Sequence, residues 1–292
     1  MIVVVGDAGM DVLVRHTKPI TPGTDQPADV RTAIGGAGAN TCAWLARLGA
    51  TPTLVGRVGD DPAGRLVAGE LTAAGVECVL AVDPEAGTCW VVVLVDGHGQ
   101  RAMLSDRGAG RRLRPADLPP GPLADARHLH LSGYVLLDPA SRPAGTAMLA
   151  AARDAGLTTS VDPQGVVPIT DPAGFLDLVR GVDLLLPNAD ELVTLTGSPE
   201  PESATALLDA VGAVAVTRGA AGASWVDDDG VLTEPAERVE CVDTTGAGDA
   251  FNAALLHARL AGSSPREALR AGVTAGSAAV RFVGAQPPVR RR

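Results

Sequence analysis

Short apolar runs that look like buried strands alternate with helical patterns along most of the chain, and this alternation leaves few possible folds. Parallel strands are joined by long crossovers, usually helices, so repeated strand–helix units predict a mostly parallel sheet with helices on both faces. We therefore expect a three-layer α/β/α, doubly wound fold. The predicted strands are Ile2–Val5, Thr53–Val58, His128–Leu131, Leu157–Val161, Val182–Leu186, Ala213–Thr217 and a run through Trp225.

A hairpin pattern interrupts this alternation. Two strand-like runs are separated by Asp96-Gly97-His98-Gly99, a turn sequence typical of hairpins, and a hairpin does not fit within a parallel sheet. We expect it to pair with two earlier extended pieces as a small antiparallel lid. The chain then forms a single domain, 1–292, with lid strands inserted at about 10–34 and 87–105. The four lid pieces are Met10–Val14, Val30–Ile34, Thr88–Val95 and Arg101–Leu104.

Composition excludes several classes of protein. The formal charge of −10 and the absence of a basic stripe argue against nucleic-acid binding. The four cysteines lack C-x-x-C spacing, so neither a zinc site nor a disulfide framework is indicated. The N-terminus lacks the pattern of a signal peptide, and no apolar run approaches the roughly 20 residues that span a bilayer. We therefore expect a cytoplasmic protein that binds neither nucleic acid nor membrane.

The stretch Cys241–Phe251 leads directly into a helical pattern. The small residues Gly246, Ala247 and Gly248 lie at the predicted helix start, where unpaired N–H groups can receive phosphate oxygens or a developing negative charge. Asp249 falls in the first turn, beside this candidate anion site. An aspartate in a first turn is also a common partner of the helix dipole, so this window alone supports both interpretations.

Lys18 is the only lysine in the chain. The chain therefore has no G-x-x-x-x-G-K-[ST] loop and no second lysine for a clamp of the protein-kinase type. Any phosphate chemistry must depend on backbone N–H groups, arginine and metal ions.

A second glycine-rich turn, Gly35-Gly36-Ala37-Gly38-Ala39-Asn40, also precedes a predicted helix. As a dinucleotide fingerprint it is poor, because Thr41 stands where the third glycine should be, which disfavours a nicotinamide-dependent oxidoreductase. A small polar ligand fits better, with the Asn40 amide as donor and acceptor. Asp7 and Asp11 follow the first strand, where open sheets bind ligands, although either is equally explained as a turn residue, and for Asp7 this explanation is slightly favoured.

Together these stretches resemble the ribokinase-like (PfkB) carbohydrate kinase family. Asp243–Phe251 resembles its C-terminal signature, and Gly35-Gly36-x-x-x-Asn40 resembles its N-terminal one. The resemblance covers nearly the whole chain and implies transfer of the γ-phosphoryl group of ATP, with Mg²⁺, to a sugar hydroxyl. Further matching motifs are Val5-Gly6-Asp7-x-x-x-Asp11, Pro187-Asn188-x-x-Glu191 and Thr217-Arg218-Gly219.

The resemblance implies a role for each matching residue. Asp249 would accept the hydroxyl proton, while the N–H groups of Gly246, Ala247 and Gly248 stabilise charge on the transferring phosphoryl group. The remaining implied residues are Asp11, Gly35, Gly36 and Asn40 for the sugar, Asn188 and Glu191 for phosphate and Mg²⁺, Thr217, Gly219 and Gly222 for the nucleotide, and Arg218 for phosphate or simply as a loop arginine.

Three departures from the family pattern concern the cation and the substrate. Asp243 and Thr245 match a monovalent-cation loop, but Pro288 stands where K⁺-activated ribokinases tend to carry serine. Ala37 replaces a lysine and Ser132 a glutamate of ribokinase proper, so the sugar need not be ribose. Nucleoside kinases of the family stack the base on aromatic rings, and this chain has only three Phe, three Trp and one Tyr, which favours a sugar.

Arg107 follows the lid hairpin, and we expect it to reach the substrate cleft, where a guanidinium would bind an acidic sugar such as a 2-keto-3-deoxyaldonate. The alternative is a loop salt bridge with Asp106 or Asp125.

The lid leaves an exposed sheet edge and face, which predicts a homodimer through the lid. A nucleoside kinase of the same family and a non-catalytic sugar- or nucleotide-binding regulator are the alternative functions.

Overall fold

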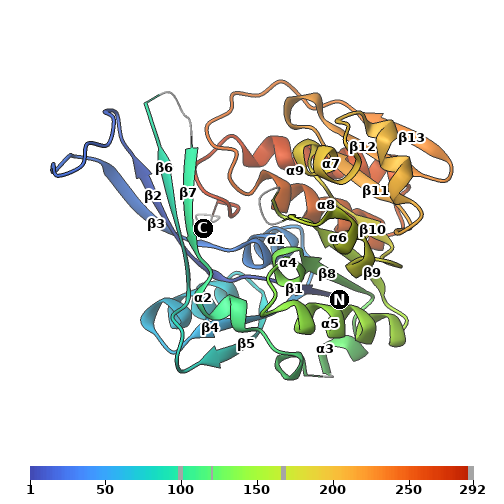
Figure 1. Ribbon diagram of the computed structural model, residues 1–292, viewed down its shortest axis with the longest axis horizontal. Helices are drawn as coiled ribbons and strands as arrows, with labels where there is room; N and C mark the ends of the chain where they lie inside the picture. Colours follow the sequence, from blue (N-terminus) through green and yellow to red (C-terminus); the bar gives the residue numbers. More distant parts are fainter. Residues whose placement is uncertain (98–100, 120, 166–168, 289–292) are drawn as a thin grey trace.

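The computed structural model describes residues 1–97, 101–119, 121–165 and 169–288. One sheet has nine strands in the order β13-β12-β11-β10-β9-β8-β1-β4-β5 (Figure 1). Its pairs are parallel from β11 to β5, whereas β12 and β13 add antiparallel at one edge. The predicted doubly wound, mostly parallel sheet is confirmed. Its strands are β1 (Ile2–Val5), β4 (Pro52–Gly59), β5 (Glu77–Asp83), β8 (His128–Ser132), β9 (Thr158–Asp162), β10 (Leu184–Leu185), β11 (Val214–Thr217), β12 (Ala223–Asp227) and β13 (Gly230–Glu234).

Helices cover both faces of this sheet because alternate strand residues point to opposite sides. Ile2 and Val4 pack in a cluster with α1, α2, α8 and α9, whereas Val3 and Val5 pack with α4, α5, α6 and α7 on the other face. The first group is α1 (Ala37–Arg47), α2 (Pro62–Ala73), α8 (Ala247–Leu260) and α9 (Pro265–Ala279). The second is α4 (Tyr134–Leu137), α5 (Arg142–Asp154), α6 (Pro172–Leu178) and α7 (Ala189–Thr196), with α3 (Gly121–Ala124), η1 (Gly108–Arg112), η2 (Pro115–Asp117), η3 (Pro201–Leu207) and η4 (Gly219–Ala221) in the connections.

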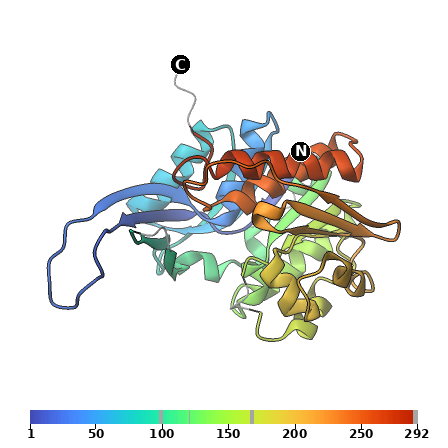
Figure 2. The same cartoon turned by 90° about the horizontal axis from the view of Figure 1, so that it is seen from above.

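The lid is a separate sheet of four strands in the order β3-β2-β6-β7, formed by β2 (Gly9–Arg15), β3 (Asp29–Gly35), β6 (Cys89–Val95) and β7 (Arg101–Asp106). It projects from the body, with the connection between β2 and β3 at its far end (Figure 2). The β2–β3 and β6–β7 pairs are antiparallel, but the central β2–β6 pair is parallel, so the lid is mixed rather than wholly antiparallel as predicted. Both central strands follow parallel strands of the body, β1 and β5, and therefore leave it in the same direction. Residues 98–100 of the predicted hairpin turn lie outside the described residues.

Two strands of the large sheet, β5 and β13, were not predicted, and both lie at its edges. Edge strands bury one side at most, and the burial of Glu77–Asp83 shows no clean alternation, which weakens the pattern in the sequence. Elsewhere the predicted elements differ mainly at their ends: β10 is limited to Leu184–Leu185, and α5 begins at Arg142 rather than near Ala147.

Polar residues gather at the carboxyl ends of the parallel strands. Asp7 follows β1, Ser132 and Asp162 end β8 and β9, Asn188 lies just beyond β10, and Thr217 ends β11. Open parallel sheets bind ligands at this edge, and the lid rises from the same edge through the connection after β1. Within the described residues, no helix is long and apolar enough to cross a membrane.

Candidate active site

The turn before α8 is built so that the helix starts at a fixed place. Gly246 precedes the helix in a left-handed conformation, φ 73°, and a Cβ there would lie 2.5 Å from the carbonyl oxygen of Ala285. The C-terminal segment is itself anchored, since Trp44 Nε1 donates to that carbonyl at 3.0 Å. A Cβ on Gly248 would instead meet nothing within 4 Å. The start of α8 therefore faces open space, as an anion site requires.

Asp249 lies in the first turn of α8 and contacts the other predicted signature. Asn40 Nδ2 donates to Asp249 Oδ2 at 2.9 Å, although the two residues are 209 positions apart. The Asn40 side chain is buried and its Oδ1 has no hydrogen-bond partner among the described residues. A buried acceptor without a partner is costly, so Oδ1 is suited to receive a donor such as a ligand hydroxyl.

Glycines allow α1 to bring Asn40 to this place. Gly36 has φ 92°, and a Cβ there would lie 2.5 Å from the carbonyl oxygen of Asp7, so another side chain would push α1 away from the end of β1. A Cβ on Gly35 would overlap the Asp11 carboxylate, which lies directly against this glycine. The two glycines thus allow Asp11 to lie directly against the turn and let α1, which carries Asn40, start beside the end of β1.

Burial raises the pKa of Asp249 to about 8; the hydrogen bond from Asn40 opposes this shift, whereas the charge of Asp162 adds to it. Burial, and then the nearby charge of Asp243, raises the pKa of Asp11 to about 6. The site therefore holds several carboxyl groups whose environment favours the protonated form. Such shifts are frequent at catalytic sites because a base must retain affinity for the proton that it accepts.

Asp162, Gln164 and Asn252 complete the site and were not predicted. Asn252 Nδ2 donates to Asp162 Oδ2 at 2.6 Å, and Gln164 donates to the same carboxylate through its backbone N at 2.9 Å and its Nε2 at 3.1 Å. Gln164 has φ 63°, a strained value for a residue with a side chain, and its side chain acts to lower the pKa of Asp249, against the larger effect of burial. Asp162 ends a predicted strand, so the rule that placed Asp7 at the sheet edge also applies to it.

Asn188 and Glu191 form a capping box at the start of α7. Asn188 Oδ1 accepts from Glu191 N at 2.9 Å, and Glu191 Oε2 accepts from Asn188 N at 2.8 Å. This local role explains the N-x-x-E spacing without a ligand. Glu191 also accepts from Gly165 N at 2.6 Å, and burial raises its pKa, with Asp162 adding to the effect. Asp162 and Glu191 are therefore neighbouring carboxyl groups at the sheet edge.

The predicted nucleotide turn follows β11. Thr217 pairs with Asn188 in an isolated bridge, which places the turn beside the start of α7. Arg218 N donates to Gly222 O at 2.8 Å, and a Cβ on Gly222 would overlap Glu234, so Gly222 has a structural role. Gly219 opens η4 with φ 54°. Arg218 Nε is buried and has no partner among the described residues.

The Asp243 carboxylate holds the loop before α8 together. Its Oδ1 accepts from Thr245 N at 2.9 Å and from Thr245 Oγ1 at 2.6 Å, and its Oδ2 accepts from Gly284 N at 3.0 Å. The two residues predicted for a monovalent cation are thus in contact with each other.

Arg107 does not form the loop salt bridge considered for it with Asp106 or Asp125. Its Nε and Nη2 donate to the two carboxylate oxygens of Asp7 at 2.8 and 2.9 Å, and its Nη1 donates to Asp138 Oδ2 at 3.2 Å. The guanidinium also lies 5.2 Å from the centre of the Tyr134 ring. These partners are spread over the sequence and come together only at the root of the lid. The N–H donors of Arg107 are thus already used in hydrogen bonds to other residues of the protein.

Comparisons with known proteins agree with the fold and identify the family. The model of the pfkB family carbohydrate kinases matches residues 1–292. The chain is 35% identical to a fructokinase of Klebsiella pneumoniae, over 87% of this chain and 82% of the relative. It is 32% identical to an ATP-dependent ribose-1-phosphate kinase of Halopiger xanaduensis, over 86% and 82% of the two chains. A crystal structure of an Escherichia coli protein assigned as ribokinase II, solved with ATP and Mg²⁺, superimposes with a TM-score of 0.86 at 26% identity, covering 97% of this chain and 94% of that one.

Proposed function

The chain belongs to the pfkB family of carbohydrate kinases and is a phosphotransferase with an alcohol group as acceptor, and from this premise we propose that it phosphorylates a small sugar of the ribose, fructose or ketodeoxy-sugar type with ATP. The observation that carries the proposal is the contact between Asn40 and Asp249. Asn40 is suited to bind the sugar, and Asp249 is suited to accept a hydroxyl proton. Asp249 also lies at the start of α8, where the helix N–H groups can receive a phosphate.

In the proposed reaction the sugar hydroxyl binds at the Asp249 carboxylate, beside Asn40. Its oxygen forms a bond to the γ-phosphorus of ATP, the bond between that phosphorus and the β-phosphate oxygen breaks, and ADP leaves. The hydroxyl proton passes to Asp249, whose raised pKa of about 8 gives it affinity for that proton. The hydrogen bond from Asn40 holds the carboxylate in position for the transfer.

The start of α8 is proposed to stabilise the transferring phosphoryl group. Its N–H groups point out of the helix without partners inside it, and the open space at Gly248 allows close approach. The Ala247 N–H donates weakly to the Thr244 carbonyl, at 3.3 Å, so Gly246 and Gly248 are the more available of the three predicted donors. No lysine replaces them, because the only lysine, Lys18, precedes β3 in the lid.

The carboxyl groups at the sheet edge are suited to Mg²⁺. Oxygen ligands from one or two carboxylates, with the remaining positions filled by water and phosphate, are what this ion takes in kinase sites. Asp162 and Glu191 are the residues that we propose to hold it, Glu191 indirectly, while Asn188 orients Glu191 through the capping box. When bound, Mg²⁺ supplies charge neutralisation on the ATP phosphates.

For the nucleotide we propose the turn after β11, with Thr217 and Gly219 approaching ATP through their backbone. Arg218 supports this proposal, because its buried Nε has no partner in the described chain and a phosphate oxygen would satisfy it. Gly222 contributes by allowing the turn to close against β13.

A sugar is favoured over a nucleoside by the positions of the aromatic rings. Trp44 stacks on Phe282 with ring centres 6.2 Å apart, and Arg259 covers the Trp225 ring at 5.5 Å. Phe175 and Phe251 are buried in the core, while the strand register puts Trp90 on the lid face opposite Asp11. Tyr134 lies near the carboxyl groups of the site, and one of its faces is under Arg107. A base would find little to stack on.

We also propose that the protein forms a homodimer through the outer face of the lid, defined as the face that carries Val12 and Val14. The register adds Val30, Trp90 and Leu104 to this face, and they are 58%, 40% and 62% exposed. An exposed apolar sheet face of this kind is usually covered by a partner, and a second copy offers the same surface.

The experiment that tests the proposed function is a coupled assay of ADP release with MgATP over a panel of ribose, fructose, 2-keto-3-deoxygluconate and adenosine. We expect ADP release that depends on a sugar and exceeds release with adenosine. Binding of sugar or nucleotide without turnover would support a regulator instead, and turnover confined to adenosine would support a nucleoside kinase.

A further inference from the structure

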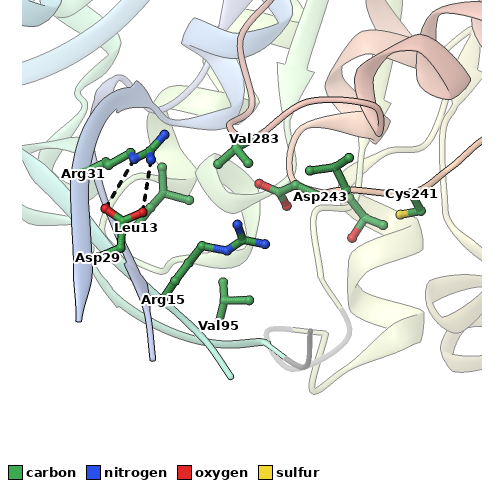
Figure 3. A pocket seen from close by; sticks show the side chains of 10 residues that line it. Leu13, Arg15, Asp29, Arg31, Val95, Cys241, Asp243 and Val283 are labelled. Carbon is green, nitrogen blue, oxygen red and sulfur yellow. Dashed lines mark hydrogen bonds and ion pairs between the residues drawn. The ribbon is translucent and has the colours of Figure 1, made fainter. Parts of the chain in front are cut away.

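A cavity of about 260 Å³ lies between the lid and the loop before α8 (Figure 3). The lid wall includes Leu13 and Arg15 of β2 and Asp29 and Arg31 of β3, and residues 241–244 form part of the opposite wall. None of the sugar-binding residues implied by the family resemblance lines this cavity.

The cavity continues the proposed sugar site along β2. Asp11, Leu13 and Arg15 alternate along one strand and share one face, so the face that presents Asp11 also lines the cavity. Asp243, in the opposite wall, is close enough for its charge to raise the pKa of Asp11. Arg15 lies four residues beyond Asp11, about 13 Å along the strand. A ligand held at Asp11 can therefore extend toward Arg15.

Two arginines line this cavity, and within the described part of the chain Arg15 is the one for which no ion pair is found. Figure 3 shows its guanidinium pointing into the space toward the Asp243 side, and among the described residues it forms no ion pair. Arg31 pairs with Asp29, at 3.1 Å between Nη2 and Oδ2, but these side chains are 68% and 52% exposed. Exposed pairs are weak, so Arg31 can exchange Asp29 for another anion at little cost.

The negative charge of the whole chain makes an arginine without an ion-pair partner in this cavity a sign of an anionic ligand. With a formal charge of −10, the protein repels anions in general, so an anionic acceptor needs a local cation. A guanidinium binds carboxylate or phosphate through two parallel N–H donors, which gives both affinity and orientation. Arg107, the arginine that the sequence suggested for this task, is held by Asp7 and Asp138.

We propose that this cavity receives an anionic group of the acceptor, so that the preferred substrate is a sugar that already carries a phosphate or a carboxylate. Arg15 is its main contact and Arg31 the second. The inference rests on the proposed function: the reacting hydroxyl lies at Asn40 and Asp249, and the anionic group at the opposite end of the acceptor. The transfer is unchanged, since the hydroxyl oxygen gains the phosphoryl group, ADP leaves and the proton passes to Asp249.

The test compares kcat/KM for matched acceptors in the ADP-release assay. Fructose and ribose are the neutral acceptors, fructose 6-phosphate and ribose 1-phosphate carry a phosphate, and 2-keto-3-deoxygluconate carries a carboxylate. We expect at least one anionic acceptor to exceed every neutral one by about tenfold or more, as expected for a charge-assisted pair. The better of the phosphate and carboxylate arms identifies the group. Added salt should reduce the advantage.

Two variants should change this preference in opposite directions. Arg15→Gln should lower kcat/KM for the anionic acceptor about tenfold or more, with little change for the neutral ones. Asp29→Asn should raise kcat/KM for the anionic acceptor severalfold, because it removes a competing charge and releases Arg31. Arg65→Gln is the matched control, since Arg65 is 66% exposed on α2 and does not line this cavity, and it should change neither value.

Equal kcat/KM for neutral and anionic acceptors would overturn the inference while leaving the proposed function intact. The same conclusion would follow if Arg15→Gln reduced turnover of neutral and anionic acceptors alike. If the folded protein released no ADP with any acceptor, the proposed function itself would fail, and this inference with it.

Discussion

At the scale of single residues, the candidate site is a group of carboxyl groups whose burial lowers the stability of the fold when they are ionised. Asp249, Asp11 and Asp162 all have raised pKa values, to about 8, 6 and 6, and burial is the largest cause for each. Residues that are unfavourable for folding and lie together at a sheet edge are expected where function requires them. Hydrogen bonds from Asn40, Asn252 and Gln164 reduce this cost only in part.

Asp249→Asn should therefore stabilise the fold at high pH. A carboxyl with a folded pKa of about 8 and an unfolded value of 3.8 favours folding while protonated, so its contribution is complete below pH 4 and is lost as the pH rises to 8. The neutral amide avoids this loss. We expect the variant to exceed the wild type by about 1–3 kcal/mol in unfolding free energy at pH 8, and to equal it near pH 4. Urea unfolding at the two pH values measures this, and a lower stability at pH 8 would contradict it.

K⁺ should have little effect on turnover. Both oxygens of the Asp243 carboxylate already accept hydrogen bonds from Thr245 and Gly284, and Pro288 stands where K⁺-activated relatives tend to carry serine. We propose that the loop is held by these hydrogen bonds. Rates at equal ionic strength in potassium and sodium chloride should agree within about twofold, by analogy with the weak net effect of one exposed charge contact. A rise of an order of magnitude in potassium would show that the loop binds the ion.

The sequence predicted the residues of the site better than their partners. Asp249, Asn40 and Asp11 stand in recognisable motifs, but the partners of Arg107 could not be predicted, because Asp7 and Asp138 are about 100 and 31 positions away from it. Gln164 was missed for a related reason. The position of the Gln164 side chain depends on a backbone conformation, φ 63°, that no local pattern in the sequence indicates.

At the scale of elements, the start of α8 depends on two glycines with different tasks. Gly246 is required by its backbone conformation and by the nearness of Ala285, whereas Gly248 faces open space. One glycine therefore serves the fold, and the other serves the proposed anion site.

Gly246→Ala and Gly248→Ala should consequently behave differently. The first places a methyl group 2.5 Å from the Ala285 carbonyl oxygen at φ 73°, and should cost about 2 kcal/mol or more of stability. The second lies inside the helix, where alanine is favoured, so stability should be unchanged or higher by up to about 1 kcal/mol. Its methyl group should obstruct the phosphate and raise KM for ATP. Thermal unfolding and steady-state kinetics separate the two effects, and similar losses of stability in both variants would contradict this account.

The strands of the lid could be predicted from the sequence, whereas the pairing of its two central strands depends on the topology of the large sheet. Strand-like runs and a hairpin turn sequence predicted its strands, and the register then puts Asp11 on one face and Trp90 on the other. The parallel pairing of β2 with β6 followed from the direction in which β1 and β5 leave the body, which requires the order of the large sheet to be known.

At the scale of the whole molecule, the outer face of the lid leads to a prediction about assembly. Leu104→Glu places a charge on this face, where the leucine is 62% exposed, and should convert the proposed dimer into a monomer. Leu66→Glu is the control, because Leu66 is 47% exposed on α2 and is not part of the outer face of the lid. Light scattering at micromolar concentration gives the mass of each. A monomeric wild type would refute the dimer, and dissociation by both variants would show that the lid is not the interface.

The fold of the whole chain brings together two turns that are about 200 residues apart in the sequence. The turn at Gly35–Asn40 and the turn before α8 lie at the same sheet edge because β1, α1 and α8 share one buried cluster. The alternation of strands and helices predicted this layered fold, and the family resemblance covers the whole length. What could not be predicted is which charged side chains remain unpaired in the cavity under the lid, because that depends on the final packing of distant loops.

The central claim is that Asp249 accepts the proton of the sugar hydroxyl, and the most direct measurement is the single-turnover rate of phosphoryl transfer in Asp249→Asn. The amide keeps the shape and the contact with Asn40 but has no affinity for the proton. We expect the rate to fall by about 10² or more, with ATP binding retained within a few fold. A rate within about threefold of the wild type, in a variant that is folded and binds ATP, would contradict the account.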